Sequence, residues 1–328
     1  MKTLYLHIGR GKTGTTAQQA YLGRNRDALL AAGVDYLLAG DRGRGVGHQA
    51  FAKSFITDMP GIMIPARDPA GIREQTAAEI CASPAPAILL SSENLPLANL
   101  GDLRAWFDAL PVRLRFEVIF LVRSQDELAE SEYNQMVKLK RETRSVDAYA
   151  ATMEGADYDA ECTAWRDRFG ADAIHARVYD ASAGDAVAQF LSCLPVSGLP
   201  APDPAGDAAY ANRSVGARAL LAARLLNGIE IEGRESLYRK LFAGFEAAGD
   251  LPAVLLDAAQ ARAIRADFAE SNRRFARSFL DPAHAACQTG DLGGRRHDDA
   301  TRDRLFAQVQ ALGPGAAGPI PGMDSGRR

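Results

Sequence analysis

The chain has 328 residues, which is enough for one large α/β domain or two modest ones with a buried core. Apolar residues make up 47% and charged residues 24%, and the formal net charge is −3. A protein without a basic excess is a poor candidate for a general nucleic-acid binder, so any anionic ligand must be held by a local site.

The cysteines and the apolar runs together bear on where in the cell the protein is found. The four cysteines lie far apart and form no CxxC pair, which predicts free thiols and not disulfides or a zinc site. The apolar run before Gly9 is too short for a signal peptide, and no run approaches the ~20 apolar residues of a membrane helix. We therefore expect a cytoplasmic protein without a membrane span.

The first part of the chain alternates between two kinds of hydrophobic pattern. Apolar runs predict strands at 3–8, 34–38, 84–95, 113–124 and 173–180. Helical patterns follow at 15–33, 48–55, 71–82, 126–141 and 185–194. This alternation predicts an α/β fold with a mostly parallel central sheet flanked by helices.

The pattern changes after residue 195. A Pro/Gly/Asp-rich stretch at 197–208 precedes two helical stretches at 214–227 and 253–280, with no strong strand between them. We predict an α/β core at 1–195 and a helical C-terminal region at 196–312 in the same domain. The segment 313–328 has too few large apolar residues to order itself and is predicted to be disordered.

A glycine-rich loop, GRGKTGTT at 9–16, joins the first strand to the first helix. Successive backbone N–H groups and a helix N-terminus form an anion site, and glycines let the backbone approach phosphate oxygens closely. Gly9 and Gly14 have the spacing of the G-x-x-x-x-G-K-[ST] loop, but Thr15 occupies the lysine position and Lys12 lies inside the loop. This departure disfavours an ordinary ATPase or kinase, although a P-loop nucleotide kinase remains the alternative enzyme.

The loop resembles the 5′-phosphosulfate-binding loop of sulfotransferases, whose core is lysine, serine or threonine, glycine, threonine, threonine. The resemblance implies a P-loop NTPase-like sulfotransferase fold and a nucleotide-binding core. The co-substrate would be 3′-phosphoadenosine 5′-phosphosulfate. The residues that would bind it here are Arg10, Gly11, Lys12, Thr13, Gly14, Thr15 and Thr16.

A second pair of residues extends the resemblance. Sulfotransferases hold the 3′-phosphate of the donor with an arginine at a strand end and a serine eight residues later, and Arg123 and Ser131 have this spacing. Arginine gives phosphate a forked, charge-assisted pair of hydrogen bonds, and serine adds a neutral donor. Two phosphate sites at neighbouring strand ends suit this donor and do not suit ATP, which has no 3′-phosphate. The resemblance covers most of 3–280.

The resemblance also implies a mechanism, an in-line displacement at sulfur by a hydroxyl or an amine. The enzyme must position the partners, neutralise the leaving phosphate oxygen and remove the acceptor's proton. Lys12 is the candidate for the neutralising charge. Glu93 is the favoured base and His48 the alternative, whereas His7 is interpreted as a core histidine. This chemistry has no obligatory magnesium ion, so we expect no metal.

The sequence therefore predicts a sulfotransferase that acts on a small-molecule or glycan acceptor. A P-loop kinase, or a non-catalytic protein that kept the nucleotide site, remains possible. We expect no nucleic-acid partner, and the sequence leaves the acceptor and the oligomeric state open.

Overall fold

The computed structural model describes residues 1–9, 12–40, 47–58, 64–139, 142–152, 156–180, 186–202, 215–281, 287, 289–295 and 297–311. Contacts between residues divide the chain into two compact units. The first, here called the sheet unit, comprises Met1–Arg123, Asp157–Asn212 and Glu270–Gly294. The second, the helical unit, comprises Ser124–Ala156, Arg213–Ala269 and Arg295–Arg328. The boundaries at 195 and 312 stay predictions, and the segment 313–328 lies outside the described residues.

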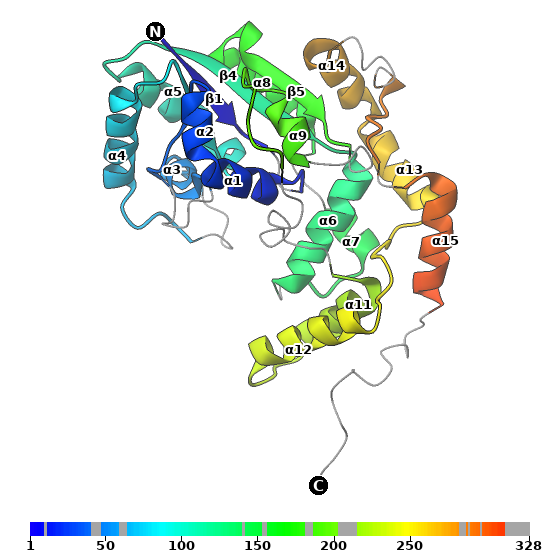
Figure 1. The fold of residues 1–328 in the computed structure, drawn as a ribbon. Coiled ribbons are helices and arrows are strands. Elements are labelled where there is room, and N and C mark those ends of the chain that lie inside the picture. The colour runs from blue at the N-terminus through cyan, green and yellow to red at the C-terminus, as the bar shows by residue number, and fades with distance from the viewer. Residues whose placement is uncertain are drawn as a thin grey trace. The chain divides into compact units, whose positions relative to one another are not determined.

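The sheet unit contains five parallel strands in the order β2-β3-β1-β4-β5 (Figure 1). The strands are β1 (Lys2–His7), β2 (Val34–Tyr36), β3 (Ala87–Ser91), β4 (Leu114–Val122) and β5 (Ile174–Val178). The predicted α/β fold with a parallel sheet is confirmed. The chain leaves β1 toward β2 and β3 on one side and later crosses to β4 and β5 on the other. Ligands of open α/β sheets bind beyond the carboxyl ends of the strands at such a reversal.

The register brings three strand ends to one edge of the sheet. His7 pairs with Ser91 of β3 and with Ile119 of β4. All five residues of β3 are buried, as is β4 from Phe116 to Val122. Continuous apolar burial of this kind is typical of parallel strands that are covered by helices on both faces.

Helices of the sheet unit flank the sheet, some directly and some through another helix (Figure 1). They are α1 (Thr15–Arg24), α2 (Arg26–Ala31), α3 (Gln49–Lys53), α4 (Pro69–Ala82), α5 (Leu100–Asp108), α8 (Tyr158–Phe169), α9 (Ala186–Leu191) and α14 (Ala269–Phe279), which begins one residue before this unit. Tyr21 of α1 and Phe190 of α9 share a hydrophobic cluster with Ile119 of β4. The next residue of β4, Phe120, points to the opposite face of the sheet. Its ring lies 5.9 Å from that of Tyr158 in α8.

The helical unit has its own core. Its described helices are α6 (Gln125–Lys138), α7 (Val146–Ala150), α11 (Ala217–Asn227), α12 (Arg234–Ala247), α13 (Ala258–Asp267) and α15 (Asp299–Gln310). Tyr133 and Val137 of α6 pack with Leu220 of α11, Leu241 of α12 and Val309 of α15. The predicted helical C-terminal region is confirmed. Across the described ranges, no helix has both the length and the apolar character that crossing a membrane requires.

Two long predicted helices are each broken once. The stretch 15–33 divides at Asn25, whose side chain donates to the carbonyl of Tyr21 at 2.9 Å and so ends α1. The stretch 253–280 begins later, at Ala258, and divides at Phe268. The sequence patterns did not predict α5, α7, α8, α12 or α15.

Candidate functional site

The loop after β1 holds two residues in the left-handed backbone region. Gly14 has φ 83° and Lys12 has φ 80°, and Lys12 is the one non-glycine with positive φ among the residues that the structure describes. A side chain costs about 1–2 kcal/mol in this conformation, and such strain is concentrated at functional sites. Arg10 and Gly11, which were also predicted to bind the donor, lie outside the described residues.

Glycine is required at position 14 for a second reason. A Cβ atom built on Gly14 would lie 2.5 Å from the Cβ of Ala186, the first residue of α9. The loop therefore packs directly against α9. Gln18 strengthens this packing, because its amide donates to the carbonyl of Thr13 at 2.9 Å and to that of Ala186 at 3.1 Å.

The N-terminus of α1 is suited to an anion. Gly14 is its N-cap and supplies no side-chain hydrogen bond, and the first turn contains no acidic residue. The first N–H groups of a helix lack intrahelical acceptors and carry the positive end of its dipole. The Thr15 hydroxyl is buried and has no hydrogen-bond partner in the described part of the chain. Thr13 and Thr15 are buried, whereas Lys12 and Thr16 are partly exposed.

Arg123 lies beside this loop. It follows β4 directly, and its Nη1 atom donates to the backbone carbonyl of Lys12 at 2.8 Å. Its guanidinium carbon lies 5.8 Å from the centre of the Tyr179 ring, and its own carbonyl accepts from the Tyr158 hydroxyl at 2.8 Å. The end of β4 and the loop after β1 thus form one polar region at the carboxyl edge of the sheet.

Ser131, the other residue predicted to bind the 3′-phosphate, belongs to the helical unit. It is a partly exposed residue of α6, which belongs to the helical unit, whereas Arg123 belongs to the sheet unit. The joint action of Arg123 and Ser131 on a 3′-phosphate stays a prediction.

Glu93 lies in the turn after β3, which ends at the same sheet edge. Its side chain is exposed, but the protein around the carboxyl group raises its pKa by desolvation, and the nearby charge of Lys12 acts in the opposite direction. A carboxyl group with a raised pKa beside a cation is suited to taking up a proton near neutral pH.

His48 is buried, and both of its ring nitrogens contact backbone groups. Nε2 lies 3.0 Å from the carbonyl of Leu37, which can only accept, so Nε2 carries the proton. Nδ1 therefore accepts from the backbone N–H of Ser91 at 3.0 Å. This arrangement fixes the segment before α3 to the end of β3, and it engages the nitrogens that a general base would use.

His7 is also buried, and its protonation state follows from its neighbours. Gln19 donates through Nε2 to the carbonyl of Ser91 at 3.3 Å and to its hydroxyl at 3.1 Å. The Ser91 hydroxyl lies 2.8 Å from Nδ1 of His7, which is the acceptor available for its hydrogen. Nε2 of His7 thus carries the proton, and this atom has no hydrogen-bond partner among the described residues. Burial lowers the pKa of His7 to about 3.

Gly9 begins the loop directly against this histidine. A Cβ atom on Gly9 would lie 2.4 Å from Nε2 of His7. The core position predicted for His7 is therefore correct, but one of its nitrogens faces the start of the loop without a partner from the described chain. Gln18 and Gln19 were not predicted as site residues, because no sequence motif signals their roles.

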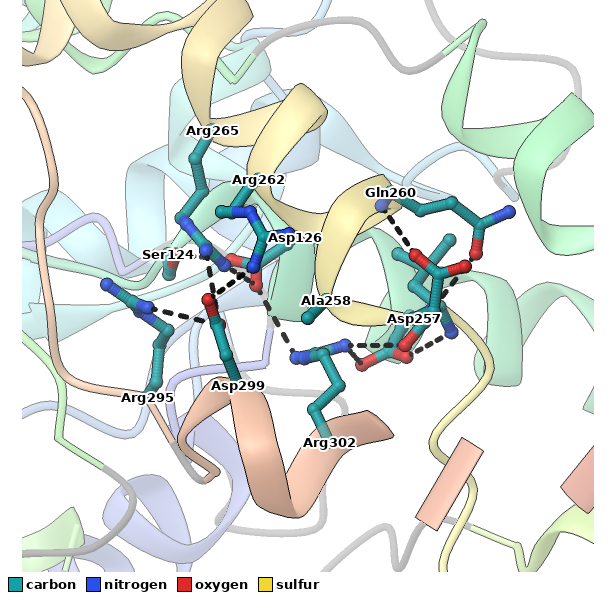
Figure 2. Close-up of polar contacts among 12 residues, drawn as sticks. Ser124, Asp126, Asp257, Ala258, Gln260, Arg262, Arg265, Arg295, Asp299 and Arg302 are labelled. Carbon is teal, nitrogen blue, oxygen red and sulfur yellow. Dashed lines mark hydrogen bonds and ion pairs between the residues drawn. The ribbon is translucent and has the colours of Figure 1, made fainter. Parts of the chain in front are cut away.

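The helical unit contains a separate group of buried charges (Figure 2). Asp126 is fully buried and accepts from Ser124 and from Arg265, the latter at 2.6 Å, and Arg302 lies 3.4 Å from it. Arg302 also lies 3.0 Å from Glu130. Each charge faces an opposite one, so we interpret this group as structural.

No protein-family model matches the chain, and no curated protein does. Among solved structures, the chain is similar to the crystal structure of a sulfotransferase from Alicyclobacillus acidocaldarius. The two share 18% sequence identity with a TM-score of 0.41, and the match covers 73% of this chain and 96% of that one.

Proposed function

We propose that this protein is a sulfotransferase that moves a sulfuryl group from 3′-phosphoadenosine 5′-phosphosulfate to a hydroxyl or amine of a small-molecule or glycan acceptor. The observation that carries the proposal is the hydrogen bond from Arg123 to the carbonyl of Lys12. It supports the proposal because Lys12 and Arg123, which the sequence assigns to two separate anion sites, are in direct contact. A donor with two separate phosphate groups needs two such sites side by side.

The loop and the start of α1 would hold the phosphosulfate end of the donor. The uncapped helix N-terminus supplies N–H groups and a positive dipole without metal or side-chain charge. Thr15 and Thr16 add hydroxyl groups at the same place. Arg123, fixed against the loop and the Tyr179 ring, would supply the charge for the 3′-phosphate.

Lys12 and Glu93 would perform the chemistry. The acceptor oxygen or nitrogen forms a bond to sulfur while the bond from sulfur to the phosphate oxygen breaks, which releases adenosine 3′,5′-bisphosphate. Lys12 would neutralise the charge on the departing oxygen, and Glu93 would take the acceptor's proton. Glu93 is favoured over His48 as the base because backbone groups engage both ring nitrogens of His48.

Thermal unfolding with two nucleotides tests the donor site. Adenosine 3′,5′-bisphosphate should raise the unfolding midpoint by the amount that its affinity dictates, and Mg-ATP should not. A larger shift with Mg-ATP would favour the P-loop kinase and overturn the proposal, as would the absence of any shift with the bisphosphate.

A turnover assay separates an enzyme from a non-catalytic binding protein. Labelled donor is offered to a panel of phenols, sugars and amines, and sulfated product is measured for the wild type and for Lys12→Ala. Lys12→Ala should lower kcat by about 10²–10³-fold with a smaller change in donor affinity. Lys240→Ala, an exposed lysine of α12, is the matched control and should leave both values unchanged. Bisphosphate binding without any turnover would support the binding protein instead.

A further inference from the structure

The helical unit contains a partly open cavity of about 330 Å³ that the proposed reaction does not use. Residues of α6, α7, α11, α13 and α15 contribute to its lining, and all of them belong to this unit. A water molecule takes up about 30 Å³ in the liquid, so the space corresponds to about eleven waters and is large enough for a small organic molecule.

One part of the lining is apolar. Leu221 of α11, Leu255, Phe306 and Val309 of α15 all line the cavity, and Val309 is buried. Pockets for small molecules combine such apolar walls with a few polar groups that fix orientation.

Arg224 of α11 is the charged donor of this lining. The charge of Arg224 lies near the Tyr133 hydroxyl, whose own hydrogen goes to the carbonyl of Arg144 at 2.7 Å. In the described part of the chain, no carboxylate lies within ion-pair distance of Arg224. Arginine presents five N–H groups in a fixed fork, so most of its donors remain for an anionic ligand.

Gln260 adds neutral donors. Its Oε1 atom accepts from the backbone N–H of Asp257 at 3.0 Å in the capping box at the start of α13, where Figure 2 shows both residues. This contact fixes the orientation of the amide, so its NH₂ group is directed away from Asp257. Among the described residues, that NH₂ group has no acceptor.

Asp147 of α7 also lines the cavity and is exposed. Its negative charge disfavours a ligand with several negative charges. We propose that this cavity binds a small amphipathic monoanion, whose carboxylate or sulfate group contacts Arg224 and Gln260 and whose apolar body contacts Leu221, Leu255 and Phe306. This site is independent of the proposed sulfuryl transfer.

Isothermal titration calorimetry of the full chain with octanoate tests the proposal. Octanoate should bind at a single site, and octan-1-ol and octylamine should bind at least tenfold more weakly, because neither offers an anion to Arg224. Absence of octanoate binding, or equal binding of the alcohol, would overturn the assignment.

Two substitutions locate the site. Arg224→Gln should weaken octanoate binding at least tenfold, whereas Arg239→Gln, which removes an exposed positive charge from α12, should leave it unchanged. Circular dichroism establishes whether each variant is folded. Unchanged binding by folded Arg224→Gln would refute the site, and if that variant does not fold, the three-probe comparison on the wild type decides. Bisphosphate binding, measured on the same samples, reports separately on the proposed function.

Discussion

The guanidinium of Arg123 donates a hydrogen bond of 2.8 Å to the backbone carbonyl of Lys12, a residue 111 positions earlier in the chain. One partner follows the fourth strand and the other lies in the loop after the first. Because β1 and β4 are neighbouring parallel strands, their carboxyl ends meet at the same edge of the sheet. The parallel pairing therefore explains how residues so far apart in sequence contact each other.

Arg123→Lys should weaken the binding of adenosine 3′,5′-bisphosphate by at least tenfold. Lysine keeps the charge but loses the planar fork that contacts both the loop carbonyl and the Tyr179 ring. Calorimetric titration measures the affinity, and Arg168→Lys, at an exposed position of α8, serves as the matched control. Equal affinities for wild type and Arg123→Lys would show that Arg123 does not contact the nucleotide.

Lys12→Gly should be more stable than Lys12→Ala by up to about 1 kcal/mol. Both variants lose the same side-chain contacts, but only glycine adopts a φ of 80° without steric cost. Chemical denaturation gives the two free energies of unfolding. Both variants should be equally defective in turnover, so the difference in stability between them would appear without a difference in activity. Equal stability of the two variants would mean that the loop conformation at residue 12 is not strained.

Glu93→Gln should lower turnover and change its dependence on pH. Desolvation raises the pKa of the Glu93 carboxyl, so the wild type should lose activity as the pH falls through a value above that of an ordinary glutamate. Only the ionised carboxylate accepts a proton, which fixes the sign of this dependence. The acidic limb of the kcat profile should disappear in Glu93→Gln. If the limb persists unchanged, another group acts as the base.

Acid should destabilise the fold partly through His7. The unfolded chain takes up a proton at His7 near pH 6.5, but burial holds the pKa in the folded state at about 3. The stabilisation is complete above pH 6.5 and is lost as the pH falls toward 3, by about 1.4 kcal/mol per pH unit. Denaturation of His7→Gln between pH 7 and 4 should give a shallower slope than the wild type. Parallel slopes would show that His7 is protonated in the folded state.

Local patterns were sufficient to predict the central sheet. The strands at 3–8 and 113–124 are continuous apolar runs. The loop from Gly9 to Thr16 is recognisable from its glycine-rich sequence. Arg123 was identified by its position at the end of the strand 113–124, by its spacing of eight residues from Ser131 and by the family resemblance. Its contact with Lys12 fits the interpretation that both residues serve one ligand.

Other features depend on contacts that the sequence does not display. The environment of His48 is created by Leu37 and Ser91, and Ser91 lies 43 residues later, at the end of β3. The orientation of Gln19 depends on the same serine. Helix α15 is polar along much of its length and was not predicted, because buried ion pairs and not an apolar face hold its first turns.

The buried charges of the helical unit also limit how the chain can be shortened. Arg302 of α15 is only 1% exposed and lies within ion-pair distance of both Asp126 and Glu130. A truncation before Asp299 would remove this cation and leave Glu130 in the interior without its arginine. Uncompensated interior charge costs several kcal/mol, a large part of the 5–15 kcal/mol that typically separates folded from unfolded chains. Helix α15 is therefore required for the stability of the helical unit. Any shorter version made for crystallisation or display should retain residues 299–310.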